Sequence, residues 1–292
     1  MSPTRPARRT RAIAAMLSMA TVAALTGCTE TDGAATPTPA VSTSVTVDPS
    51  AATTTAAAAD LTASFDKAGF GPGVGLALVP VGSSEVFTFG DQTPRVAWST
   101  MKVPLSLAAQ RNGAKQSLIK RAIIDSDNDA NLTLRESLGT PEQASGKITA
   151  VLRDGGDTTT ELVKIVEPDE TFGLTVWPLA SSAIFAAHLP CLPDSGQIVT
   201  YMGEVAGNQQ WGLESMTAKN VTTAVKGGWG PADDGGEEVR QLGLITWRDG
   251  QQVAVTMSSY RPGQSMGTGI ANLDRVAAWL TKNLKKLPRG TC

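Results

Sequence analysis

The most informative stretch of the chain reads Ser99-Thr100-Met101-Lys102-Val103-Pro104-Leu105. Apolar residues recur at helical spacing from Met101 to Gln110, and Gly113 follows them, so the pattern predicts a helix that begins near Ser99. A residue and its third neighbour lie on one face of a helix, about 4.5 Å apart along its axis. Ser99 and Lys102 are therefore expected to face the same way in the first turn.

Serine and lysine at this spacing have the chemistry of an activated nucleophile. Partial burial favours the neutral amine of Lys102, which can then accept the proton of the Ser99 hydroxyl. Free backbone N–H groups and the positive end of the helix dipole would stabilise an oxyanion beside Ser99. The spacing alone is weak evidence, because Ser117-Leu118-Ile119-Lys120 repeats it.

Two later motifs strengthen this interpretation. Ser126-Asp127-Asn128 lies at a junction between two predicted helices, and Lys226-Gly227-Gly228 lies on a predicted strand. The only histidine, His188, ends an amphipathic segment and is expected to be structural. An active serine would therefore need a lysine or a carboxylate as its base.

The rest of the chain predicts an α+β domain. A hairpin is expected from Gly73 to Phe89, and three strands are expected at 218–226, 239–247 and 251–259. The middle is predicted to be helical, with helices at 117–125, 130–138 and 142–152. An amphipathic helix from Gly269 to Leu287 closes the chain. This order predicts one domain in which helices pack on a sheet.

The order of the three motifs resembles the signature of class A β-lactamases and low-molecular-weight penicillin-binding proteins. The likeness covers roughly residues 73–287, and Trp211-Gly212-Leu213 makes it nearest to the β-lactamase-related lipoproteins of actinobacteria. The resemblance implies the serine β-lactamase/penicillin-binding fold, with an antiparallel sheet flanked by helices. The interval from Ser99 to Ser126 is shorter than is usual in class A enzymes, so a reduced helical lobe is expected.

The resemblance also implies roles for individual residues. Ser99 would be the acylated nucleophile, Lys102 its proton partner, and Ser126 the relay that passes a proton to the leaving nitrogen. The backbone N–H groups of Ser99 and Trp229 would form the oxyanion hole. The other implied substrate-binding residues are Asn128 for an amide, Lys226 and Gly228 of the third motif, and Arg240 for a carboxylate.

Two departures from the family pattern change the expected chemistry. Gly227 stands where the family has a Thr or Ser hydroxyl that binds the substrate carboxylate, so this contact is lost. Glu167-Pro168 matches the Glu-Pro pair of the deacylating loop, but Thr171 replaces the Asn that helps to hold the hydrolytic water. Glu167 is then either the deacylation base or a solvated loop carboxylate, and slow hydrolysis of the acyl-enzyme is expected.

The N-terminal region predicts export and lipid anchoring. Arginines precede an apolar run from Ala12 to Leu25, which is shorter than the roughly 20 residues of a bilayer span. Leu25-Thr26-Gly27-Cys28 resembles the bacterial lipobox, and an ordinary signal peptide with an incidental cysteine is the alternative. The predicted segments are a lipoprotein signal peptide at 1–27, a disordered Thr/Ala/Pro tether at 28–58 and the β-lactamase-like domain at 59–292.

The remaining cysteines form an even pair. With Cys28 assigned to lipid, Cys191 and Cys292 are left in an oxidising compartment, where a disulfide between them is expected. Two free thiols are the alternative.

Composition excludes several classes of function. The chain has 292 residues, of which 41% are apolar, so one sizeable core can form. A formal net charge of -2 gives no basic excess, and no nucleic-acid partner is expected. Ligand residues do not cluster at metal spacing, so neither a metal nor another cofactor is implied.

The leading hypothesis is a cell-envelope serine acyl-hydrolase that forms a Ser99 acyl-enzyme with a peptide or β-lactam amide. Its ligand would be a peptidoglycan peptide or a β-lactam-like compound, and Cys28 would hold it at the outer face of the cell membrane. One alternative is a catalytically silent lipoprotein that binds cell-wall peptide or an envelope partner. Esterase-like chemistry on another substrate is a third.

Overall fold

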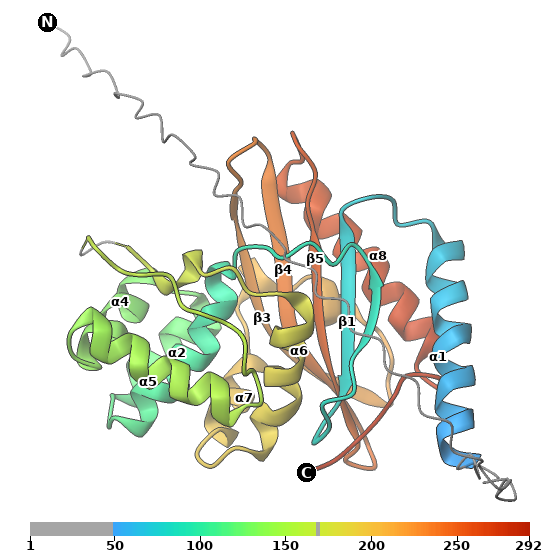
Figure 1. Cartoon of the computed structure of the whole chain (residues 1–292), viewed down its shortest axis with the longest axis horizontal. Helices are drawn as coiled ribbons and strands as arrows, with labels where there is room; N and C mark the ends of the chain where they lie inside the picture. Colours follow the sequence, from blue (N-terminus) through green and yellow to red (C-terminus); the bar gives the residue numbers. More distant parts are fainter. Residues whose placement is uncertain (1–48, 168–169) are drawn as a thin grey trace, which may run out of the picture. The chain divides into compact units, whose positions relative to one another are not determined.

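A five-stranded antiparallel sheet forms the centre of the molecule (Figure 1). The computed structural model describes residues 49–292 except 168 and 169. The strand order is β2-β1-β5-β4-β3, which makes β3 an edge strand. The strands are β1 (Val74–Pro80), β2 (Phe87–Gly90), β3 (Val221–Pro231), β4 (Glu237–Trp247) and β5 (Gln252–Ser259).

Helices cover both faces of this sheet (Figure 1). Helix α8 packs on β4 and β5 with α1 beside it, while α6 packs across β1, β5 and β4 from the other side. Helices α2 to α5 and α7 form a helical lobe beyond α6 and β3. The bounds are α1 (Pro49–Ala68), α2 (Lys102–Arg111), α3 (Gln116–Lys120), α4 (Asn128–Ser137), α5 (Pro141–Asp154), α6 (Leu179–His188), α7 (Gly196–Met202) and α8 (Met266–Asn283).

Short helical turns join these elements near the predicted motifs. Three of them matter for the site: the 3₁₀-helix η1 (Trp98–Met101), the π-helical turn η2 (Arg121–Asp125) and the 3₁₀-helix η3 (Phe172–Leu174). The others are η4 (Leu189–Cys191), η5 (Gly207–Gln209) and η6 (Gly212–Ser215).

The hydrophobic core is divided by the sheet. Every residue of β1 is buried, as expected of a strand covered on both faces. Leu76 and Leu78 belong to the cluster shared with α1 and α8, whereas Ala77 and Val79 belong to the cluster shared with α6 and the helical lobe. Alternate residues of one strand thus enter different halves of the core.

The predicted elements are confirmed with shifted boundaries. The strand expected at 218–226 begins at Val221 and continues to Pro231, which places the whole third motif within β3. The helix expected at 117–125 is divided into α3 and η2. It stops at Ser126, whose φ of 56° lies in the left-handed region, and the Asp127 side chain then caps α4 by accepting from Ala130 N at 2.9 Å.

The predicted tether extends too far. Helix α1 begins at Pro49, so residues 49–58 are helical rather than disordered. This stretch is rich in alanine, the strongest helix former, and it continues into a segment whose Leu61 and Phe65 are buried. The rest of the tether, the signal peptide and Cys28 lie outside the described residues. Within the part that is described, no helix is both long and apolar enough to cross a bilayer.

The predicted pairing of Cys191 with Cys292 is present. Their Cα atoms are 5.4 Å apart across a disulfide that closes a sequence separation of 101. Just before it, Gly290 exchanges backbone hydrogen bonds of 2.8 and 2.9 Å with Gln252 at the start of β5. The C-terminus is thereby fastened to both η4 and the sheet.

Candidate active site

Ser99 is the second residue of η1, which packs against β3. Trp98, just before it, has a φ of 48°, a left-handed conformation that non-glycine residues adopt only when their surroundings impose it. The Trp98 indole lies over Gly230 and donates from Nε1 to Glu238 Oε2 at 3.3 Å. Strands β3 and β4 therefore hold the backbone turn that presents Ser99.

Gly228 allows β3 to approach this turn. A Cβ atom at Gly228 would lie 3.0 Å from both Ser99 N and Ala97 O, closer than side chains normally pack. The approach matters because the N–H of Ser99 is at the start of a helix, where such groups have no intrahelical partner. Gly228, a residue predicted for substrate binding, thus has a steric role.

The N–H of Trp229 points to the free edge of the sheet. Gly227 N donates to the side chain of Gln209 at 3.1 Å, so Gly227 faces away from β4. The register between β3 and β4 is continuous, and residues two apart in a strand point the same way. Ser99 and Trp229 both line one cavity, as an oxyanion hole at this edge would require.

Lys102 joins the first motif to the second. Its ammonium, at the first position of α2, donates to Asn128 Oδ1 at 2.7 Å, to Ser126 Oγ at 3.2 Å and to the carbonyl of Ser126. No hydrogen bond to Ser99 Oγ forms among the described residues. Burial lowers the pKa of Lys102 to about 8, although the charge of Asp127 acts in the opposite direction. The amine is therefore neutral in part at mildly alkaline pH.

Lys226 joins the third motif to the second. Its fully buried ammonium donates to Ser126 Oγ at 2.9 Å, to Gly227 O at 2.9 Å and to Gln209 Oε1. Burial, and then the charge of Lys102, hold the pKa of Lys226 well below its ordinary value. The Ser126 hydroxyl accepts from both lysines, so its own proton remains for another acceptor.

Gln209 is a site residue that the sequence analysis missed. Its buried amide donates from Nε2 to Ile123 O at 3.0 Å and Ile124 O at 2.8 Å, while Oε1 accepts from Lys226 and Gly227. All four of its hydrogen-bonding positions are used. It ties β3 to η2, directly ahead of Ser126. Its sequence neighbourhood, Gly-Asn-Gln-Gln, carries no motif that could have revealed this.

Ser99 and Lys102 of the first motif, Asn128 of the second and Trp229, which follows the third, line a cavity of about 570 Å³. Ser126 and Lys226 are not among its lining residues. Its walls come from η1, the start of α2, one face of α4, the segment around η3 and the end of the β3–β4 hairpin. The lining residues are Trp98, Ser99, Met101, Lys102, Leu105, Asn128, Asp129, Asn131, Leu132, Arg135, Glu170, Thr171, Phe172, Gly173, Trp229, Gly230, Pro231 and Glu237.

Glu167, predicted as a catalytic residue, does not line this cavity in the structure. Glu167 is exposed and lines a separate cavity of about 210 Å³, whereas Glu170 lines the cavity that contains Ser99. The Glu170 carboxylate accepts from the backbone N–H groups of Val166 at 2.6 Å and Glu167 at 3.1 Å, and these bonds lower its pKa. This local turn places Glu170, rather than Glu167, at the cavity.

Arg240, predicted to bind a substrate carboxylate, also lies away from this cavity. Its side chain is 1% exposed and does not line the cavity. The guanidinium donates to the carbonyls of Arg95 at 3.1 Å, Val96 at 2.9 Å and Trp177 at 3.0 Å. Arg240 therefore links β4 to the backbone ahead of η1 and ahead of α6.

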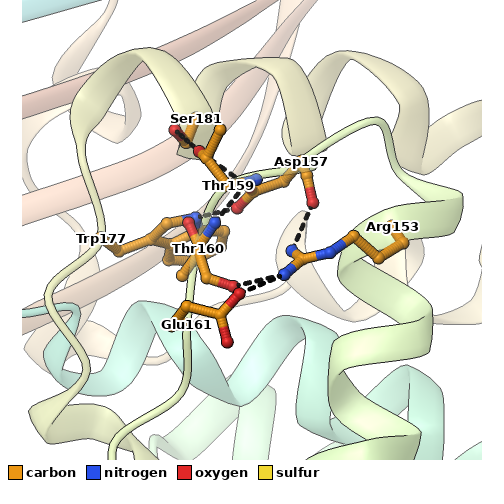
Figure 2. Close-up of polar contacts among 7 residues, drawn as sticks. All are labelled: Arg153, Asp157, Thr159, Thr160, Glu161, Trp177 and Ser181. Atoms are coloured by element: carbon orange, nitrogen blue, oxygen red, sulfur yellow. Dashed lines mark hydrogen bonds and ion pairs between the residues drawn. The ribbon is translucent and has the colours of Figure 1, made fainter.

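A polar network holds the two ends of the segment that carries Glu170 and η3 (Figure 2). Trp177 Nε1 donates to Asp157 Oδ2 at 2.8 Å, and Asp157 Oδ1 accepts from Thr160 N at 3.0 Å. Arg153, at the end of α5, donates to Asp157 O at 2.7 Å and to Thr160 O at 2.9 Å. These bonds close the neck of the loop from 158 to 176, which forms one wall of the cavity.

Two further contacts in Figure 2 join this neck to Glu161 and to helix α6. Arg153 also donates to Glu161 Oε1 at 3.1 Å, and the hydroxyls of Thr159 and Ser181 are 3.1 Å apart. The second contact reaches the start of α6. Over the described residues, no group of three His, Cys, Asp or Glu side chains is placed to hold a metal ion.

Comparisons with known proteins identify the fold. No protein-family model matches the chain, and no curated protein sequence matches it. The TLA-3 extended-spectrum β-lactamase is 13% identical, with a TM-score of 0.61 over 77% of this chain and 99% of that chain. A β-lactamase from Xanthomonas campestris pv. campestris is 19% identical, with a TM-score of 0.59 over 78% and 98%.

A mutant of PBP-A, solved as an acyl-enzyme complex with penicillin G, is 18% identical. Its TM-score is 0.59 over 80% of this chain and 97% of that chain. At these identities the likeness concerns the fold. The chain therefore has the fold of class A β-lactamases and penicillin-binding-protein-like proteins, as the three motifs predicted.

Proposed function

We propose that the protein is a serine acyl-hydrolase in which Ser99 forms an acyl-enzyme with an amide, lactam or ester carbonyl. The observation that supports this most is that Lys102, which lines the same cavity as Ser99, donates to Ser126 Oγ, to which Lys226 also donates. Separate segments of the chain supply these groups, and a purely structural cluster would not need Ser99 and Lys102 to line an open cavity.

The proposed reaction begins with attack by Ser99 Oγ on the substrate carbonyl carbon. The Ser99 proton passes to neutral Lys102, and the N–H groups of Ser99 and Trp229 bind the oxyanion. The intermediate collapses when the bond to the leaving nitrogen or oxygen breaks, and Ser126 passes a proton to that atom. Water then hydrolyses the ester on Ser99 and releases the acid.

Deacylation is the slower half of this scheme. Glu167 lies outside the cavity, and Glu170 is held by two backbone N–H groups that favour its charged form. Thr171, which stands at the position of the water-holding Asn in the family, uses its hydroxyl to accept from Gly173 N at 3.1 Å. A long-lived acyl-enzyme is therefore expected.

We propose that the protein acts in the cell envelope, where its ligand is a cell-wall peptide or a β-lactam-like compound. The lipobox at residues 25–28 supports export and attachment to the outer face of the membrane through Cys28. Cells fed radioactive palmitate should label the wild-type chain and not Cys28→Ala. Equal labelling of both chains would contradict the anchor.

The proposed nucleophile is tested by intact mass after incubation with a fluorophosphonate probe. Wild type should gain one adduct, and Ser99→Ala should gain none. Ser117→Ala is the matched control, because Ser117 begins the second Ser-x-x-Lys sequence and does not line the cavity. Labelling that persists in Ser99→Ala, or that is absent from folded wild type, would contradict the proposal.

A catalytically silent binding protein is the second candidate. Its support is the geometry of Lys102, whose ammonium donates to the second motif and not to Ser99. In that case the cavity would bind cell-wall peptide without forming an adduct, and Ser99→Ala would bind as tightly as wild type.

A further inference from the structure

The groups expected to hold a substrate carboxylate are each absent or committed elsewhere in this site. Three were implied by the resemblance: a hydroxyl at position 227, the ammonium of Lys226 and the guanidinium of Arg240. Where these three groups lie in the structure limits the class of substrate. This inference rests on the proposed acyl-hydrolase function.

Position 227 has no room for a side chain. A Cβ atom on Gly227 would lie 2.8 Å from Cζ2 and 3.3 Å from Cη2 of Trp211, with the Trp229 ring 3.5 Å away. Trp211 is 5% exposed, and its Nε1 donates to Asn208 O at 3.0 Å, so the indole is fixed. The hydroxyl is thus excluded by Trp211, whose ring occupies the space.

Lys226 has no donor left for a substrate. An ammonium carries three protons, and those of Lys226 are used by Ser126 Oγ, Gln209 Oε1 and Gly227 O. The side chain has no exposed surface. Arg240 is likewise buried behind η1 and donates to backbone carbonyls.

The walls of the cavity carry more acidic than basic side chains. Asp129, Glu170 and Glu237 line it, against Lys102 and Arg135. Glu237 stands on β4 directly opposite Pro231, at the same end of the β3–β4 hairpin as Trp229. A substrate carboxylate placed along β3 would meet an indole and a carboxylate, and losing its hydration there without new hydrogen bonds is unfavourable.

We propose that the site selects acyl donors that carry no carboxylate beside the bond that Ser99 attacks. The substrate class is a neutral ester, or an amide within a peptide chain and away from its terminal carboxylate. The leaving group of either packs on Trp229. Attack forms the bond from Ser99 Oγ to the carbonyl carbon and breaks the bond from that carbon to the leaving oxygen or nitrogen. The Ser99 proton reaches the leaving atom through Lys102 and Ser126, and water completes the hydrolysis. Trp211 is then a specificity-determining residue.

The test compares two esters of similar shape, one with a neutral and one with an anionic leaving group. Each enzymatic rate is divided by the rate of hydroxide-catalysed hydrolysis, because the two phenols are not equally good leaving groups. Phenylacetyl-glycyl esters of 3-hydroxybenzamide and of 3-hydroxybenzoate present the same acyl group with a neutral and an anionic leaving group. The purified full chain with its disulfide intact is assayed for release of the phenol, with hydrolysis by Ser99→Ala subtracted. The kcat/KM for the neutral ester, so corrected, is expected to exceed that for the anionic ester by about tenfold or more, the scale of one unmade polar contact.

A pair of variants tests the part played by Trp211. Replacing Trp211 by Ala and Gly227 by Thr together opens the space and supplies the hydroxyl, so the preference for the neutral ester should fall or reverse. Trp247→Ala is the control, because it removes an equally buried indole on β4 that does not line the cavity, and it should keep the wild-type preference.

The outcomes separate this inference from the proposed function. Equal rates, or faster hydrolysis of the anionic ester, would overturn the inference while the Ser99 adduct upholds the acyl-hydrolase. Failure of both esters with a protein that the fluorophosphonate probe labels would also overturn it. If neither the esters nor the probe modify Ser99, the proposed function fails, and the inference with it.

Discussion

Lys102 sets the expected pH dependence of the site. Its pKa is lowered to about 8 because its ammonium is buried. Only the neutral amine can accept the Ser99 proton, so the active fraction increases as the pH rises through this value. Nothing in the Ser-x-x-Lys spacing reveals that shift, because Ser117 and Lys120 share the spacing and Lys120 is exposed.

The rate of Ser99 acylation should therefore rise between about pH 7 and about pH 9 and level off above it. The measurement is the rate of fluorophosphonate adduct formation followed by intact mass. Lys102→Arg keeps a positive charge but cannot deprotonate, so it should be slower by about 100-fold or more and lack this rise. A wild-type rate that is constant across the range would exclude Lys102 as the base.

Gln209 is predicted to position Lys226. Gln209→Leu keeps similar volume but leaves Lys226 with one acceptor fewer and frees the carbonyls of Ile123 and Ile124, at a cost of about 1–3 kcal/mol in the free energy of unfolding. Urea unfolding measures this. Gln210→Leu is the control, because the Gln210 side chain donates to Val205 O and makes no contact with Lys226 among the described residues. Equal losses in the two variants would contradict the positioning role.

Residues recruited from distant segments were the hardest to predict. Short motifs mark Ser99, Lys102, Ser126 and Lys226 in the sequence, and in the structure Lys102 and Lys226 both contact Ser126. Arg240 and Glu167 do not line the cavity. The sequence could not predict this placement, because strand register and loop position do not fix where a side chain points. Gln209 was missed because its partners come from η2 and β3, which are far from it in sequence.

At the scale of elements, the loop from 158 to 176 depends on its neck. Trp177→Phe removes the donor to the buried carboxylate of Asp157 and should lower the free energy of unfolding by about 1–3 kcal/mol. It should also speed proteolytic cleavage within the loop. Trp247→Phe is the control, since Trp247 Nε1 has no hydrogen-bond partner in the described structure. Equal effects of the two substitutions would show that loss of indole packing, rather than the neck, is responsible.

The sequence predicted which elements exist better than where they end. Hydrophobic periodicity located all five strands, because one or both faces of each strand are buried. It ended β3 too early, at Lys226, since Gly227, Gly228 and Gly230 have no side chains to mark a face. It did not predict helix α1, whose first part lies in an alanine-rich segment that was interpreted as a tether.

At the scale of the whole molecule, the disulfide joins the C-terminus to the helical side of the fold. In the chain-entropy description, closing a separation of 101 residues stabilises the folded state by about 4–5 kcal/mol. The double substitution Cys191→Ser, Cys292→Ser should lower the free energy of unfolding accordingly. Unfolding of wild type with and without reductant provides the comparison, and a difference below about 1 kcal/mol would contradict this role.

That cross-link has a practical consequence for recombinant production. Cys191 and Cys292 pair only where thiols are oxidised, so a chain made in a reducing cytosol reaches the purification column without the covalent link between its last residue and η4. Preparations intended for kinetics should come from a secretory host or an oxidising strain. A free-thiol titration should accompany every batch, so that inactivity caused by a missing disulfide is not attributed to Ser99.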